Sequence, residues 1–277
     1  MLLKELLAEV PGIVGTRGNL DMEIGALVTD SRIKEPVQNG LFFCISGMRF
    51  DAHDYADQVA QRGCTALIVE RFLESPLAQV KVENVRSAMA HIASAFYGHP
   101  SRSLRMVGVS GTKGKTTTSF LMKAILEKAG MKTGLIGTTG NMIGTKHLPS
   151  SMTTPDPVDL HRTLRQMVDE GVEAVSMEVS AHAVDMHRLE GVVFEAACYT
   201  NLSQDHLDYF GTMERYFEAK KSFFMSGAVQ NAALNADEET SESIRRDLRV
   251  PYLTLALVPT LMFLPGISRL PKTAYPS

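Results

Sequence analysis

The sequence predicts an α/β protein with a small amino-terminal α/β domain at residues 1–102 and a parallel-sheet domain at residues 103–254. From Met106 onward, short apolar runs alternate with helical patterns, which is typical of a parallel sheet covered by helices. A glycine-rich loop joins the first strand of this series to its first helix. Before Met106, shorter elements form a separate series that ends at "GHPSRS", where glycine and proline stop a helix.

The amino-terminal series begins with two apolar runs, "ALVTDSR" at 26–32 and "LFFCIS" at 41–46, separated by the turn-forming "KEPVQNG". We expect these runs to be strands. A helix is expected at 55–63, a strand at 66–70 and a second helix at 87–98. These elements predict a small domain that is separate from the longer series after it.

The second series is more regular. Strands are expected at 106–110, 132–138, 174–180 and 194–202, with helices at 116–130 and 159–171. In parallel sheets of this kind, ligands bind at the carboxyl ends of the strands. Small and polar residues follow several of these strands, so we expect the functional site at that edge.

The last segment, residues 251–277, differs in composition from the rest of the chain. It holds five of the twelve prolines and no Asp or Glu. Its apolar part is shorter than the roughly 20 residues of a membrane helix, and proline interrupts it. We expect this segment not to continue the alternating pattern, and we treat residues 255–277 as an aberrant tail.

Composition excludes several classes of function. The chain has 277 residues, 44% of them hydrophobic, and a formal charge of -3, so it has no basic surface for nucleic acid and no polybasic membrane signal. Three widely spaced cysteines without a CxxC pair predict reduced thiols. The opening "MLLKELLAEVPG" lacks the apolar core of a signal peptide. We therefore expect a cytoplasmic monomer that binds no nucleic acid and does not insert into a membrane.

The stretch "GVSGTKGKTTTSF" at 108–120 resembles a phosphate-binding loop with unusual spacing. The common pattern would place its first glycine at 109, where Val109 stands between Gly108 and Gly111. Gly111 and Gly114 allow backbone N–H groups to point inward, and Lys115 can reach phosphates. A glycine turn with an incidental Lys-Thr pair is the alternative, but a strand before the loop and a helix after it favour a phosphate site.

Other candidate residues have two interpretations when each is considered alone. Glu178 follows a buried strand and can hold Mg²⁺ or cap the next helix. Asp205, His206 and Asp208 can bind ligands or cap a loop. The default for Lys220, Lys221, His182, His187 and Arg188 is a surface position.

Taken in order, "GTKGKTTT", "TTPD", "MEVSAH", "TNLSQDHLDYFGT" and "YFEAKKSFF" closely resemble the Mur ligase family of cell-wall synthesis. The segment "LVTDSRIKEPVQNGLFFCISGMRFDAHDY" resembles the uridine-nucleotide-binding domain of two ligases of that family. The resemblance covers about residues 2 to 250 and is strongest to the ligases that add the third amino acid. It implies ATP-dependent addition of meso-diaminopimelate or L-lysine to UDP-MurNAc-L-Ala-D-Glu, with the UDP-MurNAc-dipeptide carboxylate activated as an acyl phosphate.

The resemblance also implies site residues. Lys115, Lys220 and His206 are the expected catalytic residues, and Lys220 is expected to react with CO₂ to give a carbamate, with Lys221 the weaker candidate. Thr116 and Glu178 are expected to hold one Mg²⁺, with His206 on a second and the Lys220 carbamate as a further metal ligand. ATP is expected on Gly111, Thr112, Lys113, Gly114, Lys115, Thr116 and Thr117. The UDP-MurNAc-dipeptide is expected on Thr29, Ser31, Thr153, Thr154, Ser180 and Arg188.

The sequence departs from the family pattern at four positions. Lys113 replaces the usual asparagine, Met186 a glutamine, Ala52 a glycine and Phe210 a histidine. None of these is an expected metal ligand or the phosphate-binding lysine, so we expect them to affect substrate contacts more than the type of reaction.

The resemblance implies a third domain that selects the incoming amino acid; we expect it to be absent here, and we expect the central P-loop ATPase-like domain to be incomplete. A truncation or frameshift near Leu255 is our hypothesis for the change in composition. Three alternatives remain open: a non-catalytic fragment that binds nucleotides and nucleotide sugars, the family's D-alanyl-D-alanine-adding ligase, and an unrelated P-loop NTPase. The sequence leaves open which amino acid is added.

Overall fold

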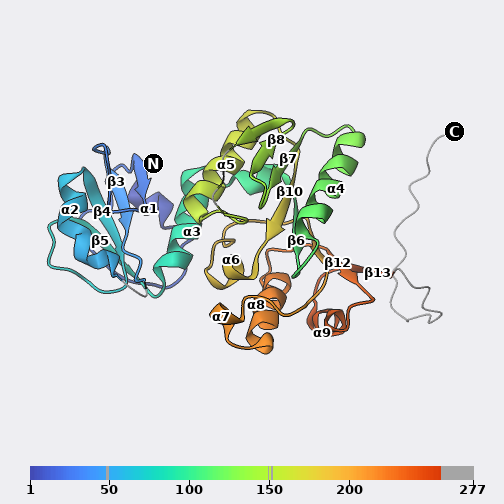
Figure 1. Ribbon diagram of the computed structural model, residues 1–277. Coiled ribbons are helices and arrows are strands. Elements are labelled where there is room, and N and C mark those ends of the chain that lie inside the picture. The colour runs from blue at the N-terminus through green and yellow to red at the C-terminus, as the bar shows by residue number, and fades with distance from the viewer. Residues whose placement is uncertain (48–49, 149, 151, 257–277) are drawn as a thin grey trace.

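The structure is a computed structural model that describes residues 1–47, 50–148, 150 and 152–256. Of the predicted tail, only Leu255 lies in a described strand and Ala256 follows it; residues 257–277 lie outside the described residues. Within the described ranges the chain forms two β-sheets, with helix α3 (Val85–Phe96) between them (Figure 1). No helix in these ranges is both long and apolar enough to cross a membrane.

The first sheet has the strand order β1-β5-β4-β3-β2. Its strands are β1 (Ile13–Arg17), β2 (Ala26–Val28), β3 (Gly40–Phe43), β4 (Cys64–Val69) and β5 (Ala78–Val82). All neighbours are parallel except the edge pair β1 and β5. Side chains of α1 (Leu3–Leu6) and α3 form one core with the sheet, whereas α2 (Ala56–Gln61), which follows the 3₁₀ turn Ala52–Tyr55, contributes to another.

Strands β1 and β5 of this sheet were not predicted, and one predicted strand is shorter than expected. Edge strand β1 is mostly exposed, so it lacks the apolar alternation that indicates a strand. The strand expected at 26–32 ends at Val28. Thr29 and Ser31 therefore follow β2 at its carboxyl end, as expected for ligand-binding positions.

The second sheet has the order β13-β12-β11-β6-β10-β7-β8-β9. Its strands are β6 (Arg105–Ser110), β7 (Thr133–Ile136), β8 (Asn141–Ile143), β9 (Lys146–Leu148), β10 (Ala174–Val179), β11 (Ala196–Tyr199), β12 (Ala232–Asn235) and β13 (Tyr252–Leu255). Two pairs, β7–β8 and β8–β9, are antiparallel, and the other pairs are parallel. The helices are α4 (Lys115–Lys128), α5 (Pro157–Asp169), α6 (Ala181–Asp185), α7 (Leu207–Phe210), α8 (Met213–Met225) and α9 (Thr240–Asp247), with a 3₁₀ turn at Pro100–Ser103.

The expectation that the chain leaves the alternating pattern at Pro251 is wrong for its first residues. After α9, β13 pairs in parallel with β12 over Ala232–Asn235 and Tyr252–Leu255. Because β13 is an edge strand, its four residues are exposed. An exposed strand does not need the apolar pattern by which buried strands are predicted.

The two faces of the second sheet are covered differently. Helices α5, α8 and α9 share one apolar core with alternate residues of the strands. Helix α4 instead contacts β10, β7 and β6 and contributes no residue to that core. In Figure 1, α4 lies on the opposite side of β7 and β10 from α5. Since residues alternate along β10, Met177 faces the core and Glu178 faces α4.

Gly108 lies inside β6 and is not part of the loop that follows it. A Cβ added there would lie 2.9 Å from the Phe223 ring of α8 and 3.1 Å from Phe194. The glycine therefore allows α8 to pack closely on the sheet. This packing explains why a glycine stands one position before the common phosphate-loop spacing.

The two sheets are joined by contacts to α3. Glu190 accepts hydrogen bonds from Ser87 and from His187 Nδ1, and His187 Nε2 lies 3.2 Å from the Asn84 amide. The Ser94 hydroxyl donates to the Gly191 carbonyl at 3.0 Å. These contacts attach the segment after α6 to the amino-terminal part, while the predicted boundary between residues 102 and 103 stays a prediction.

His161 of α5 is the most deeply buried histidine at this junction, with no exposed surface. Neither ring nitrogen has a hydrogen bond of normal geometry. The pKa of His161 is lowered to about 4: burial is the main cause, the Glu190 backbone opposes it, and nearby His99 and His91 add to it. The ring is therefore neutral in the folded protein at neutral pH.

We expect His161 to make the fold sensitive to acid. Below pH 6.5 the unfolded chain binds a proton at this residue that the folded chain does not bind until about pH 4. The free energy of unfolding should therefore fall by about 3 kcal/mol across this range from this group alone. Urea titrations at several pH values should show a smaller loss for His161→Leu. The same substitution at the exposed His147 is the control and should leave the acid-induced loss of stability as in wild type. Equal losses for wild type and His161→Leu would contradict the interpretation.

Candidate functional site

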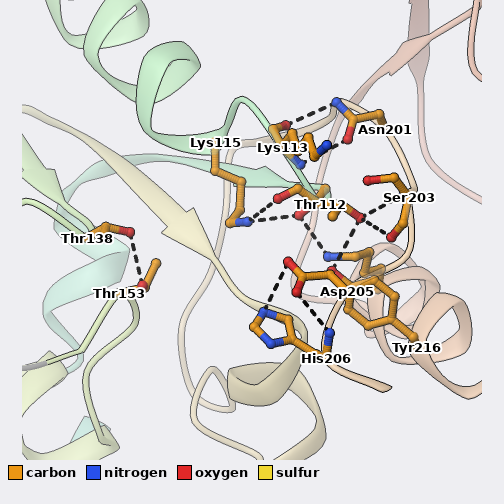
Figure 2. A network of polar contacts seen from close by, with 12 residues as sticks. Thr112, Lys113, Lys115, Thr138, Thr153, Asn201, Ser203, Asp205, His206 and Tyr216 are labelled. Atoms are coloured by element: carbon orange, nitrogen blue, oxygen red, sulfur yellow. Dashed lines mark hydrogen bonds and ion pairs between the residues drawn. The ribbon is translucent and has the colours of Figure 1, made fainter. Parts of the chain in front are cut away.

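The candidate site lies where the carboxyl ends of β6, β7, β10 and β11 meet (Figure 2). The loop after β6 contains the glycines of the predicted phosphate site, and α4 begins directly after it, at Lys115. Gly111 has φ +145° and Gly114 has φ +82°, values that favour glycine. The N–H groups of the first turn of α4 have no carbonyl partner within the helix, so this end attracts anions.

The loop after β11 holds the first half of the phosphate loop in place. The backbone carbonyl of Asn201 accepts the Thr112 N–H at 2.9 Å, and its side-chain Oδ1 accepts the Lys113 N–H at 2.9 Å. The amide of Asn201 donates to the Lys113 carbonyl at 3.1 Å, and Thr200 Oγ1 donates to it at 2.8 Å. Ser203 exchanges two hydrogen bonds with the Thr112 hydroxyl, as Figure 2 shows. We call these contacts of Thr200, Asn201 and Ser203 the loop clamp.

Lys115 folds back over the loop that precedes it. Its Nζ donates to the carbonyls of Gly111 and Thr112, both at 3.0 Å. Burial lowers the pKa of Lys115, while Glu178 and Asp205 oppose that shift. The Lys115 cation is therefore held on the carbonyl side of the loop.

Lys220 projects from α8 into the same place and is 1% exposed. Its Nζ donates to the Gly111 carbonyl at 2.8 Å, so Lys115 and Lys220 share one acceptor. The nitrogen also lies 4.4 Å from the centre of the Tyr216 ring. Burial, and then the charge of Lys115, lower the pKa of Lys220 to about 7. Lys221 instead points toward α9, where it pairs with Asp247 at 2.5 Å.

Glu178 at the end of β10 is a buried carboxylate, 1% exposed. Its oxygens accept hydrogen bonds from Thr116 Oγ1 at 3.0 Å and from the N–H and hydroxyl of Thr138 at 2.9 and 3.2 Å. A Cβ at Gly137 would lie 2.2 Å from Glu178 Oε1, so only glycine leaves room for the carboxylate there. The pair of Thr116 and Glu178 offers hard oxygen ligands of the kind that Mg²⁺ prefers.

His206 is the N-cap of the short helix α7, with a left-handed backbone, φ +53°, and its side chain is half exposed. Its ring packs edge-to-face on His182, with ring centres 4.7 Å apart, and lies 6.0 Å from the Tyr216 ring. Burial and the neighbouring His206 lower the pKa of His182. His182 of α6 is therefore a partly exposed helix residue that packs against His206.

The described residues contain no cluster of three His, Cys, Asp or Glu side chains arranged around a metal position. The predicted metal set includes only Glu178 and His206 of these types. It depends on the hydroxyl of Thr116 and on a modified Lys220 for its other ligands. The structure brings Thr116 to Glu178, and it brings Lys220 to the phosphate loop.

Arg188 and the "TTPD" segment lie together beside this edge. The Arg188 guanidinium contacts the Thr154 carbonyl at 3.0 Å and Asp156 at 2.9 Å. The Thr154 hydroxyl donates to the Glu178 carbonyl and accepts the Ser180 N–H, and Ser180 Oγ caps α6. The hydroxyls of Thr154 and Ser180 already have partners, and Thr153 Oγ1 lies 3.0 Å from Thr138 Oγ1 (Figure 2).

Thr29 and Ser31 follow β2, a strand of the first sheet, whereas the residues above lie at the edge of the second sheet. Thr29 is exposed, and the Ser31 carbonyl accepts a hydrogen bond from Gln58 at 3.1 Å. Their predicted role in binding the UDP-MurNAc-dipeptide stays a prediction.

Sequence reasoning missed several residues of the site, among them Gly137, Thr138, Asn201 and Tyr216. Gly137 and Thr138 end a predicted strand, and their position at the carboxyl edge was the available signal. Asn201 stood inside the quoted "TNLSQDHLDYFGT". Tyr216 precedes Lys220 by four residues, which places both on one face of a helix.

Comparison with known proteins identifies the relatives of this chain. The family model described as the Mur ligase middle domain matches residues 109–257. The chain is 43% identical over 264 residues to the UDP-N-acetylmuramoyl-L-alanyl-D-glutamate–2,6-diaminopimelate ligase of Geobacillus thermodenitrificans, covering 93% of this chain and 53% of that protein. The ligase of the same name from Geobacter metallireducens is 38% identical, with 93% and 52% covered. The chain thus spans about half the length of the curated relatives that it matches.

The structure of this chain also superimposes on solved structures of related ligases. One described as a UDP-N-acetylmuramoyl-L-alanyl-D-glutamate–2,6-diaminopimelate ligase superimposes with a TM-score of 0.81 at 26% identity, covering 94% of this chain and 53% of that one. MurF from Acinetobacter baumannii, with a TM-score of 0.63 at 23% identity over 91% of this chain and 52% of that one, shares the fold. From the family model that matches more than half of its length, we conclude that this chain belongs to the Mur ligase family.

Proposed function

We propose that this chain holds the ATP site and the UDP-MurNAc-dipeptide site of an ATP-dependent ligase that adds 2,6-diaminopimelate to UDP-MurNAc-L-Ala-D-Glu. Relatives at 35–43% identity carry the name of this ligase. That name favours this activity over addition of D-alanyl-D-alanine and over an unrelated NTPase. It also favours diaminopimelate over L-lysine, a choice that the sequence left open.

The convergence of two lysines on the phosphate loop is the observation that carries the proposal. Lys115 and Lys220 donate to the same carbonyl, that of Gly111, from α4 and α8. An ordinary phosphate loop needs only the first lysine. A second, buried one indicates chemistry beyond nucleotide binding.

In the proposed reaction the substrate carboxylate attacks the γ-phosphorus of ATP, ADP leaves, and an acyl phosphate forms. The amine of diaminopimelate then displaces inorganic phosphate to form the amide. Lys115 and the N–H groups at the start of α4 balance the charge on the phosphoryl group. Mg²⁺, when bound, would neutralise phosphate charge, and Thr116 and Glu178 fit it as oxygen ligands. His206 is the proposed ligand of a second ion.

The environment of Lys220 favours its proposed conversion to a carbamate. An uncharged amine attacks CO₂, forms the N–C bond and releases a proton, and burial brings the pKa of Lys220 to about 7. The carbamate is an anion, so the charge repulsion between Lys220 and Lys115 would become an attraction. It would also supply the oxygen ligand that an ammonium group cannot provide.

The UDP-MurNAc-dipeptide is proposed to contact both sheets. Thr29 and Ser31 would bind its uridine end, and Arg188 with Thr153, Thr154 and Ser180 would bind its peptide end. Arg188 suits a carboxylate because its guanidinium forms paired hydrogen bonds. Thr154 and Ser180 contribute mainly by holding this segment, since their hydroxyl groups already have partners. We further propose a cytoplasmic monomer, and sedimentation would test the monomeric state.

Calorimetry and phosphate release test this function. The 277-residue chain should bind ATP with Mg²⁺ and, separately, UDP-MurNAc-L-Ala-D-Glu. Any phosphate release should require this dipeptide and diaminopimelate, with L-lysine a poor substitute. Binding of both nucleotides without release would support the non-catalytic alternative. Failure to bind either one would contradict the proposal.

A further inference from the structure

The phosphate loop divides into two halves that differ in their hydrogen bonds. The N–H groups of Thr112 and Lys113 both point to oxygens of Asn201, each at 2.9 Å. In this conformation they are not free to bind phosphate, although the whole stretch 111–117 was expected to cradle ATP. The first N–H groups of α4, by contrast, have no carbonyl partner within the helix. The side chains of this turn have partners, since Lys115 donates to two loop carbonyls and Thr116 to Glu178.

The side chain of Asn201 contacts both polar groups of one residue's backbone. Its Oδ1 accepts from the Lys113 N–H, and its Nδ2 donates to the Lys113 carbonyl at 3.1 Å. A primary amide presents an acceptor and a donor side by side, which a carboxylate or a hydroxyl does not. An aspartate would keep the first bond, but it would set a lone pair against the carbonyl and add negative charge near the phosphates.

Orientation of the Lys113 backbone controls where α4 starts. Gly114 follows it as the left-handed N-cap, with φ +82°, and a Cβ added there would meet no atom within 4 Å, so packing does not constrain that residue. Thr200 Oγ1 donates a hydrogen bond to the Lys113 carbonyl at 2.8 Å, and the Ser203 N–H donates to the Thr112 hydroxyl. The clamp thus determines the direction in which the first turn of α4 points.

We propose that Asn201 is a positioning residue for the nucleotide: it holds the Lys113 backbone so that the start of α4 faces the phosphates. This inference rests on the proposed ATP site and adds a residue 88 positions away in sequence. Asn201 touches the loop and not the reacting atoms, so its effect should appear in nucleotide affinity.

The test compares ATP dissociation constants of the 277-residue chain and its variants, measured with a fluorescent ATP analogue. Asn201→Ala should weaken binding about tenfold, as expected for loss of a hydrogen-bonded constraint. Asn201→Asp should weaken it further. Asn231→Ala is the matched control, because that amide also donates to a backbone carbonyl of the sheet domain, that of Glu195, at 2.8 Å. Its ATP affinity should stay within about twofold of wild type.

Two further measurements separate positioning from general loss of structure. Affinity for UDP should not change in either Asn201 variant. Amide hydrogen exchange at Thr112 and Lys113 should be faster without nucleotide. If Asn201→Ala does not fold, amide exchange at Thr112 and Lys113 in Asn201→Asp decides the question, because this variant keeps the side-chain volume and the exchange is measured without nucleotide.

The outcomes distinguish the two proposals. Wild-type ATP affinity in the folded Asn201 variants would overturn the positioning role alone. Absence of ATP binding by the wild-type chain would contradict both the proposed function and this role.

Discussion

Gly111→Ala should destroy the nucleotide site, because the added methyl group has no room. Its Cβ would lie 2.0 Å from Thr200 Oγ1 and 3.0 Å from the Asn201 N–H nitrogen, at a φ of +145° that disfavours side chains. Moving Thr200 breaks its bonds to Lys113 and Ser110, so the loop clamp opens. We expect about 3 kcal/mol of lost stability and about 100-fold weaker ATP binding.

Gly114→Ala is the matched control for that prediction. Gly114 also has a positive φ, +82°, but no atom lies within 4 Å of an added Cβ. It should therefore lose only about 1 kcal/mol, the cost of the backbone conformation alone. Urea denaturation and ATP titration of both variants provide the measurement. Equal losses for the two alanines would show that the contact with Thr200 is unimportant.

Lys220→Met should abolish ligase turnover, reducing it about 1,000-fold or more where the wild type is active, since removal of transition-state electrostatics has effects of this size. Methionine fills similar volume without a charge, so the fold should keep its stability or gain some, because the buried cation is removed. With ¹³C-labelled bicarbonate, wild-type protein should show a carbamate signal by NMR that the variant lacks.

Lys221→Met provides the comparison one residue along the same helix. Lys221 pairs with Asp247 and Ser243, away from the phosphate loop. The variant should keep the carbamate signal and lose at most about 1 kcal/mol of stability. A carbamate signal that survives Lys220→Met and disappears with Lys221→Met would show that our proposal assigns the modification to the wrong lysine.

Some parts of the site could be predicted because the relevant residues are close together in sequence. Gly111, Gly114, Lys115 and Thr116 lie within six residues, and the strand and helix that flank them were visible as apolar patterns. Lys220, by contrast, looked like a surface lysine among aromatic residues. Only the resemblance to a family suggested its role, and the structure then showed that it is buried against the loop.

Other parts depend on contacts between distant residues. Asn201 is needed because Lys113 lies beside it, and Gly137 is needed because Glu178 on another strand fills the space of its side chain. No local pattern records such neighbours. Strands β1 and β13 were missed for a different reason: at the edges of their sheets they are exposed, so their residues lack the periodicity that burial imposes.

The glycine inside β6 has a consequence for how variation in this chain is interpreted. Phe223, which occupies the space left by Gly108, follows Lys220 by three residues on α8. A larger residue at 108 would push the helix outward and carry the lysine amine with it. Position 108 therefore acts as a spacer that sets the reach of a reactive group on another element. A substitution there could leave an intact, folded protein whose two lysines no longer meet.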